Sequence, residues 1–128
     1  MVVLDTHVLI HDALEPKRLS ARARRALDGE HGALAASDIS LWEIAMLISK
    51  GRLDPAADAA RFIEKILEAR ALRILPITPQ IAVMAQSDDF SHGDPADRII
   101  AATARAHGAA LVSADAQLRR SRGVEIIW

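Results

Sequence analysis

The stretch Val2-Val3-Leu4-Asp5-Thr6-His7 decides how the rest of the chain is interpreted. It is a short apolar run that ends abruptly in a carboxylate, and a run of this kind predicts a buried β-strand over 2–4. Asp5 then falls where that strand ends. Because ligand sites of open α/β sheets gather at the carboxyl ends of the strands, Asp5 is well placed for chemistry. A second carboxylate, a metal or a base is therefore expected near it.

Apolar runs and helical patterns alternate along the remaining chain. Further strands are expected over 32–36, 72–77, 109–113 and 124–128. Helices are expected over 6–14, from 39 to about 50, from Asp54-Pro55 to about 71, from 78 to about 85 and from 94 to 107. The polar segment 86–93 predicts an exposed loop. This alternation predicts an α/β fold, a single domain over 1–128 with a central parallel sheet of about four or five strands flanked by helices.

Composition excludes several classes of protein. Hydrophobic residues make up 51% of the 128 residues and charged residues 26%, which is typical of one soluble globular domain. No apolar run approaches the roughly 18–20 residues of a membrane span, no export signal is visible, and cysteine is absent. We therefore expect a cytoplasmic protein without a membrane contact. Aromatic residues, at 3%, are too few for a platform that stacks many bases.

Basic residues are concentrated in two segments, although the net charge is only −1. Residues 17–25 contain basic side chains and no acidic one, and a second basic group lies at 119–122. A solvated helix face explains such a run, and a surface that faces phosphate groups explains it equally. For Arg98 the alternative to phosphate is an ion pair with a neighbouring acid. The candidate residues for contact with phosphate groups are Lys17, Arg18, Arg22, Arg25, Arg98, Arg119 and Arg120.

Several carboxylates could be explained as helix caps. Glu43 stands three residues after Ser40, which is the spacing of a capping box. Asp94 precedes Pro95, as an N-cap precedes a proline at the first helical position. Asp115 would cap a short helix. The alternative for Glu43 is that it lies on an apolar helix face as a buried carboxylate, which needs a compensating cation.

Four acids nevertheless share one feature of position. Asp5 and Asp115 leave strands, whereas Glu43 and Asp97 lie near the N-termini of helices. In a parallel sheet both kinds of position lie at the same edge, so all four acids are expected to converge on one cleft. Crowded carboxylates repel one another unless a divalent cation neutralises them. Oxygen ligands without cysteine or paired histidine favour Mg²⁺ or Mn²⁺ and suit phosphoryl chemistry.

Four strings in the same order resemble the motifs of PIN-domain ribonucleases, in particular the VapC toxins of prokaryotic toxin–antitoxin pairs. They are Leu4-Asp5-Thr6-His7, Leu41-Trp42-Glu43-Ile44-Ala45, Asp94-Pro95-Ala96-Asp97-Arg98-Ile99-Ile100-Ala101-Ala102 and Leu111-Val112-Ser113-Ala114-Asp115. The resemblance spans residues 3–128. It implies a metal-dependent endoribonuclease, usually a homodimer, that a partner antitoxin encoded beside it holds inactive.

The resemblance also implies roles for individual residues. Asp5, Glu43 and Asp97 match the three core acids, and Asp115 matches a more variable fourth, so these four are the expected catalytic residues. Asp5 and Asp97 are expected to hold one Mg²⁺ or Mn²⁺, with Glu43 and Asp115 binding through water or completing a second site. The expected supporting residues are Thr6, Asp94 and Ser113. Asp94 belongs to the pattern His92-Gly93-Asp94-Pro95, which one branch of the family carries.

The implied reaction is hydrolysis of an RNA phosphodiester by a water molecule that the metal activates, leaving 5′-phosphate and 3′-hydroxyl ends. The scattered histidines His7, His11, His31 and His107 receive no catalytic role. Two alternatives remain. One is a metal-dependent phosphatase or a phospho-receiver, and the receiver would carry paired early acids and a late lysine that this chain lacks. The other is a non-catalytic RNA- or protein-binding module whose acids are caps.

Overall fold

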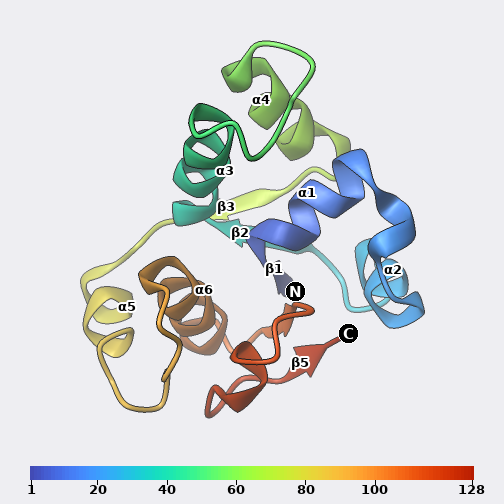
Figure 1. Ribbon diagram of the computed structural model, residues 1–128. Coiled ribbons are helices and arrows are strands. Elements are labelled where there is room, and N and C mark those ends of the chain that lie inside the picture. Colours follow the sequence, from blue (N-terminus) through green and yellow to red (C-terminus); the bar gives the residue numbers. More distant parts are fainter.

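A five-stranded parallel sheet organises the fold (Figure 1). The computed structural model describes all 128 residues. The strands are β1 (Val2–Leu4), β2 (Leu34–Ser37), β3 (Arg73–Leu75), β4 (Ala110–Val112) and β5 (Ile126–Ile127). They lie in the order β3-β2-β1-β4-β5, and every neighbouring pair is parallel. The opening stretch of the sequence is thus the central strand, and the predicted α/β class with a parallel sheet is confirmed.

Helices cover both faces of the sheet. They are α1 (Thr6–Leu14), α2 (Ala21–Leu27), α3 (Ile39–Ser49), α4 (Ala59–Ala69), α5 (Pro79–Met84) and α6 (Pro95–Ala106), with short 3₁₀ turns at Pro16–Arg18 (η1) and Leu118–Arg120 (η2). Figure 1 shows α1 and α2 on one side of the sheet and α5 and α6 on the other. No helix has the length and apolar character that crossing a bilayer requires.

Alternation along β1 builds two hydrophobic cores. Val2 and Leu4 pack into a core with residues of α1, α2 and α4, whereas Val3 packs on the opposite face against α5 and α6. All three side chains are at most 1% exposed. A strand that is buried on both faces needs apolar side chains at every position, which is why this stretch is continuously apolar.

The predicted helix from Asp54-Pro55 is wrong at its start. Residues 54–58 form a turn in which Asp54 Oδ1 accepts the Ala56 amide at 2.9 Å and Ala56 adopts a positive φ of 52°. The helix begins at Ala59, and the Asp58 side chain caps it by accepting the Arg61 amide. An aspartate before proline opens a turn as readily as a helix. Here Asp54 opens a turn, and Asp58 is the residue that caps the helix.

The segment 86–93 is also less exposed than its polar sequence predicts. Phe90 is only 1% exposed and belongs to the core that α5 and α6 cover. Asp89 accepts a hydrogen bond from Arg105 of α6 at 2.7 Å, and the Arg105 guanidinium lies over the Phe90 ring. These contacts fix the segment against α6, so the side chain that follows them, His92, has a defined place.

Candidate active site

The carboxyl ends of β1 and β4 place Asp5 beside Asp115. The two strands pair directly, and the Asp5 amide continues their ladder by donating to the Val112 carbonyl at 3.0 Å. Between the two acids, the buried Ser113 hydroxyl donates to Asp5 Oδ2 at 2.9 Å and accepts the Asp115 amide at 3.0 Å. Ser113 is therefore in contact with both acids.

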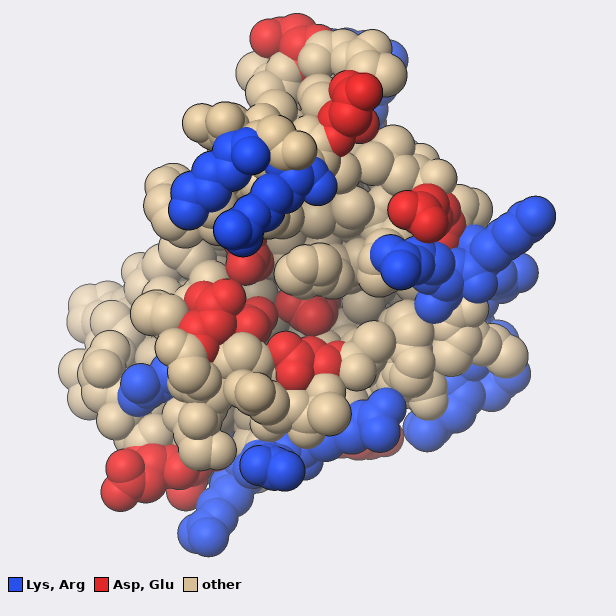
Figure 2. All heavy atoms as spheres, in the orientation of Figure 1, with Lys and Arg blue, Asp and Glu red and all other residues tan.

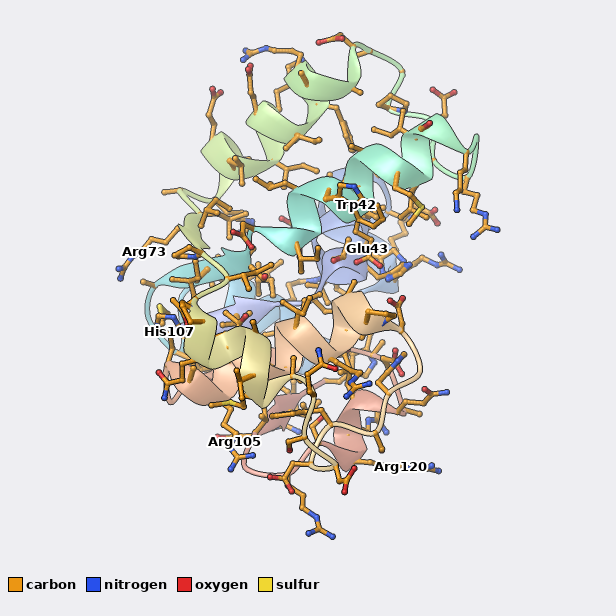
Figure 3. All side chains as sticks on the ribbon, turned by 90° about the vertical axis from the view of Figure 1, so that its left-hand side faces the viewer. Trp42, Glu43, Arg73, Arg105, His107 and Arg120 are labelled. Carbon is orange, nitrogen blue, oxygen red and sulfur yellow. The ribbon has the colours of Figure 1, made fainter.

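Helix α3 contributes Glu43, which is only 4% exposed. The capping-box alternative is wrong, because the helix begins after Asp38 and Ser40 already lies inside it. Ser40 instead accepts the hydroxyl of Thr6, and Glu43 Oε1 is buried without a hydrogen-bond partner. In Figure 3 Glu43 lies where α3 faces α6. Glu43 is thus a buried carboxylate on a helix face, which was the alternative to the capping box.

The start of α6 contributes Asp94 and Asp97. Asp94 caps the helix, since its Oδ1 accepts the Ala96 amide at 2.9 Å. Asp97 points inward and is 7% exposed. Carboxylate oxygens of Glu43, Asp94 and Asp97 lie within 4.8 Å of one another, so Asp94 combines its structural role with a place in the acidic group.

Thr6 supports the site indirectly. Its hydroxyl is buried and donates to Ser40 Oγ at 2.9 Å, which joins the start of α1 to α3. The Thr6 hydroxyl therefore donates to Ser40 and not to one of the carboxylates. Its contribution is to hold the helix that carries Glu43 against the strand end that carries Asp5.

Burial and mutual repulsion perturb the acids strongly. Burial raises the pKa of Asp97 to about 7, and the neighbouring Asp5 adds to this rise. Burial also raises the pKa of Asp5, against the hydrogen bond from Ser113, with a further contribution from Glu43. No lysine or arginine lies within ion-pair distance of Asp5, Glu43 or Asp97. The chain therefore leaves this negative charge without an internal cation of its own.

His92 belongs to the site, although its sequence pattern predicted no role for its side chain. Its Nε2 lies 2.8 Å from Asp115 Oδ2 and 3.2 Å from Asp97 Oδ2. Its Nδ1 accepts the Asp94 amide at 2.9 Å, so the proton of the neutral ring is on Nε2, which donates toward the two carboxylates. Burial alone would raise the pKa of Asp115, but this hydrogen bond holds it below its usual value. The sequence feature that pointed to His92 was the His92-x-Asp94-Pro95 pattern, but this pattern does not say which residues His92 contacts.

An open cleft of about 480 Å³ gives access to Asp5 and Asp115. Its lining residues are Asp5, His7, His11, Arg18, Ala114, Asp115 and Trp128. Figure 2 shows carboxylates gathered in a hollow at the centre of one face, with basic side chains on its flanks. A cleft with acids at the bottom and cations at the rim suits a metal ion below a phosphodiester chain.

The candidate RNA-binding residues differ in their position. Arg18 lines the acidic cleft, and Arg22 and Arg119 together line a neighbouring hollow. Arg98 donates to the Ala85 carbonyl at 2.8 Å and pairs with no acid, so the ion-pair alternative is wrong. The other candidates, which are Lys17, Arg25 and Arg120, are exposed.

The donor set fits a divalent cation. Asp5 Oδ1 and Glu43 Oε1 are buried oxygens with no hydrogen-bond partner, and a buried polar atom left in this state is costly. Both belong to carboxylates that interact with Asp97. A cation coordinated by these oxygens would satisfy both orphaned atoms and neutralise the charge that raises the pKa of Asp97. Hard oxygen ligands of this kind are those that Mg²⁺ and Mn²⁺ prefer.

Comparison with known proteins gives the family of this chain. The PIN domain model matches residues 2–124. The chain is 40% identical over 123 residues to ribonuclease VapC22 of Mycobacterium tuberculosis, covering 94% of this chain and 92% of the relative. It resembles the structures of VapBC2 from Rickettsia felis bound to a promoter DNA fragment (TM-score 0.73, 18% identity, 98% and 97% coverage) and FitAcB from Neisseria gonorrhoeae (0.69, 24%, 98% and 96%). Those two likenesses concern the fold. With its family model, its relative and its acid-lined sheet edge in agreement, the chain belongs to the PIN domain family.

Proposed function

We propose that this protein is a metal-dependent endoribonuclease that hydrolyses RNA phosphodiester bonds. The observation that carries the proposal is the pair of orphaned buried oxygens, Asp5 Oδ1 and Glu43 Oε1, beside Asp97. Acids that served only as caps would use their oxygens on backbone amides, as Asp94 does. The relative named as a ribonuclease supports RNA as the substrate class.

The acids of the site and Arg18 would have different roles in the reaction. Asp5 and Asp97 would hold the cation, which we propose to be Mg²⁺ or Mn²⁺, with Glu43 and Asp115 beside it. When bound, the cation supplies positive charge for the phosphate and lowers the pKa of a water molecule. Glu43, beside the cation, would orient the attacking water. Arg18 at the cleft would bind a flanking phosphate.

The partners that we propose follow from the VapC-type relative. The protein would be the toxin of a type II toxin–antitoxin pair, bound and inhibited by a cognate antitoxin, and it would be a homodimer. Induction of the protein alone should arrest growth, and co-expression of the neighbouring gene should restore it. Growth arrest that persists in an inactive site variant would contradict a toxic role for RNA cleavage.

Cleavage by purified variants tests the proposal directly. We expect Asp5→Asn and Asp97→Asn each to reduce RNA cleavage in Mg²⁺ by about 10³-fold or more, because each removes a charge that the cation requires. Asp12→Asn is the matched control, because Asp12 is paired with Arg70 on another surface. Cleavage should be retained in this control. Full activity in both site variants would overturn the assignment.

The chemical ends of the products and the response to metal separate the alternatives. Attack by water leaves 5′-phosphate and 3′-hydroxyl ends, so a 2′,3′-cyclic phosphate would contradict the mechanism. Mg²⁺ or Mn²⁺ at about 100 times its Kd should stabilise the wild-type protein by about 2.7 kcal/mol in thermal melting. A non-catalytic module whose acids are only caps should show no such gain.

A further inference from the structure

Trp128 stands between two hollows of the surface. One is the acidic cleft of about 480 Å³ that Asp5 and Asp115 line. The other, of about 320 Å³, is lined by Arg22, Arg119, Ile126 and Trp128. Trp128 is the residue that both hollows share. A ligand that extends from the acids toward the arginines must therefore pass the indole.

The sheet explains this position. β5 pairs in parallel with β4, and the Ser113 amide donates to the Ile127 carbonyl at 3.2 Å. Trp128, which follows β5, therefore lies at the same carboxyl edge as the acids that follow β1 and β4. The indole is half-buried and packs on the hydrophobic core beneath α1 and α2. Its position is fixed while part of it remains accessible from the two hollows.

The arginines of the second hollow come from both basic segments of the sequence. Arg22 belongs to α2 and Arg119 to the 3₁₀ turn η2, so residues almost a hundred positions apart meet there. Both are exposed, and neither is within ion-pair distance of an acid. Unpaired guanidinium groups on a surface are available for phosphate.

Few other side chains can stack on a base. Phe62 and Phe90 are 7% and 1% exposed and lie inside the cores. Trp42 is 60% exposed, but it lies on the outer side of α3 and lines neither hollow (Figure 3). Among the phenylalanines and tryptophans, Trp128 is thus the residue that combines access to the cleft with neighbouring arginines. The low aromatic content excludes an extended platform but not a single stacking position.

We propose that Trp128 stacks on a nucleobase of single-stranded RNA and that Arg22 and Arg119 bind the adjoining phosphates. This inference rests on the proposed ribonuclease function and adds a subsite next to the scissile phosphate, on the β5 side of the cleft. Stacking tolerates any base, because every base has a π face. Trp128 therefore determines the path and position of the bound RNA strand more than it selects a base sequence.

Fluorescence of Trp128 tests the contact without relying on cleavage. The chain has two tryptophans, so Trp42→Phe leaves Trp128 as the sole indole reporter. In a Trp42→Phe/Asp97→Asn protein, which keeps RNA intact, we expect short single-stranded RNA of mixed sequence to quench the emission. Inorganic polyphosphate, which carries charge but no bases, should bind without quenching. Emission that RNA leaves unchanged, or that polyphosphate quenches equally, would overturn the stacking contact.

Binding of labelled RNA by variants gives the second measurement. Trp128→Leu preserves an apolar side chain against the core and removes the stacking face, so it should weaken RNA binding by about 5- to 150-fold. Trp128→Phe should recover much of this loss. Arg22→Gln combined with Arg119→Gln should weaken binding of RNA and polyphosphate alike and reduce the slope of log affinity against log salt by about 1.4. Wild-type affinity in Trp128→Leu would refute the subsite.

The Trp128 subsite and the proposed ribonuclease activity can be refuted separately. A protein whose Trp128 emission responds to RNA but which never cleaves it would retain the subsite and lose the proposed activity. A protein that cleaves RNA while its Trp128 emission and its Trp128→Leu affinity are unaffected would retain the activity and lose the subsite. If Trp128→Leu fails to fold by thermal melting, the fluorescence experiment alone decides.

Discussion

Two groups of charged side chains in this molecule are built in opposite ways. On the surface formed by α1, α2 and α4, Arg70 binds Asp12 with two hydrogen bonds of 2.8 and 2.9 Å and binds Asp28 at 3.2 Å. At the sheet edge, Asp5, Glu43 and Asp97 are buried and have no lysine or arginine in reach. The same residue types therefore perform two tasks: one group is neutralised within the chain, and the other is not.

The difference separates structural acids from acids kept for a ligand. Arg70 links three helices and also donates to the Leu27 carbonyl. Its ion pairs and hydrogen bonds therefore lower the free energy of the folded state. Each orphaned oxygen of the sheet-edge group raises it. A fold retains such a cost where a function requires it, and a divalent cation removes it on binding. The predictions below test whether the two groups are independent in this sense.

The largest expected effect is a loss of folding stability with rising pH, which the ionisation of Asp97 causes in the metal-free protein. Its pKa is about 7 in the folded state, against 3.8 as the ordinary value. From about pH 4 to pH 7 the unfolded chain loses this proton first, so stability falls as pH rises, by at most about 4 kcal/mol. Asp97→Asn should lack this loss. Its stability relative to the wild type should therefore increase across that pH range in denaturant titrations with a chelator present.

The paired group provides the control for this experiment. Asp12→Asn should show no such gain over the same pH range, because Asp12 is neutralised by Arg70 in the folded protein. Addition of Mg²⁺ at pH 8 should reduce the advantage of Asp97→Asn, since the cation stabilises the ionised wild type. If Asp97→Asn and the wild type differ by the same amount at pH 4 and pH 8, burial of the Asp97 charge is not the source of the cost.

The next effect concerns His92, which joins two acids of the unneutralised group. Its Nε2–H lies between Asp97 and Asp115 and sets the orientation of both carboxylates. His92→Ala should weaken Mg²⁺ binding by about 10- to 100-fold in calorimetric titration, because hydrogen bonds behind metal ligands contribute that much. His92→Gln, whose amide can donate from a similar place, should retain most of the affinity.

His107→Ala is the matched control for the loss of an imidazole. His107 caps the far end of α6, away from Glu43 (Figure 3). If His92→Gln binds Mg²⁺ as weakly as His92→Ala, donation from Nε2 is not what matters, and direct ligation by the ring becomes the better explanation.

The fold and the meeting of four acids at one sheet edge could be predicted because their signals are local. Each strand appears as a short apolar run, and the rule that places strand ends and helix starts at one edge brings Asp5, Glu43, Asp97 and Asp115 together. The start of α4 could not be settled in this way. Asp54-Pro55 and Asp58 both suit a cap, and their competition is decided by the turn that Ala56 closes.

The missing parts of the site depend on contacts between distant residues. His92 meets Asp115 across 23 positions, and Arg70 meets Asp12 across 58. Segment 86–93 is polar, and its anchoring by Phe90 and Arg105 has no periodic pattern. A residue in such a segment receives its role from packing, which a single sequence does not encode locally.

The smallest expected effect lies in the neutralised group. Arg70→Met keeps the apolar stem that packs beside α1 and removes the charge, leaving Asp12 half-buried without its partner. Because the Arg70 side chain is 31% exposed, water compensates part of the loss, and we expect destabilisation of about 1–2 kcal/mol. Thermal melting should show a decrease in Tm of about 3–8 °C. The further Tm increase that Mg²⁺ produces should be the same as in the wild type, because the cation binds the other group. A variant that loses both stability and the Mg²⁺ response would show that the two groups are coupled through α1, which links Asp12 to the end of the strand that carries Asp5.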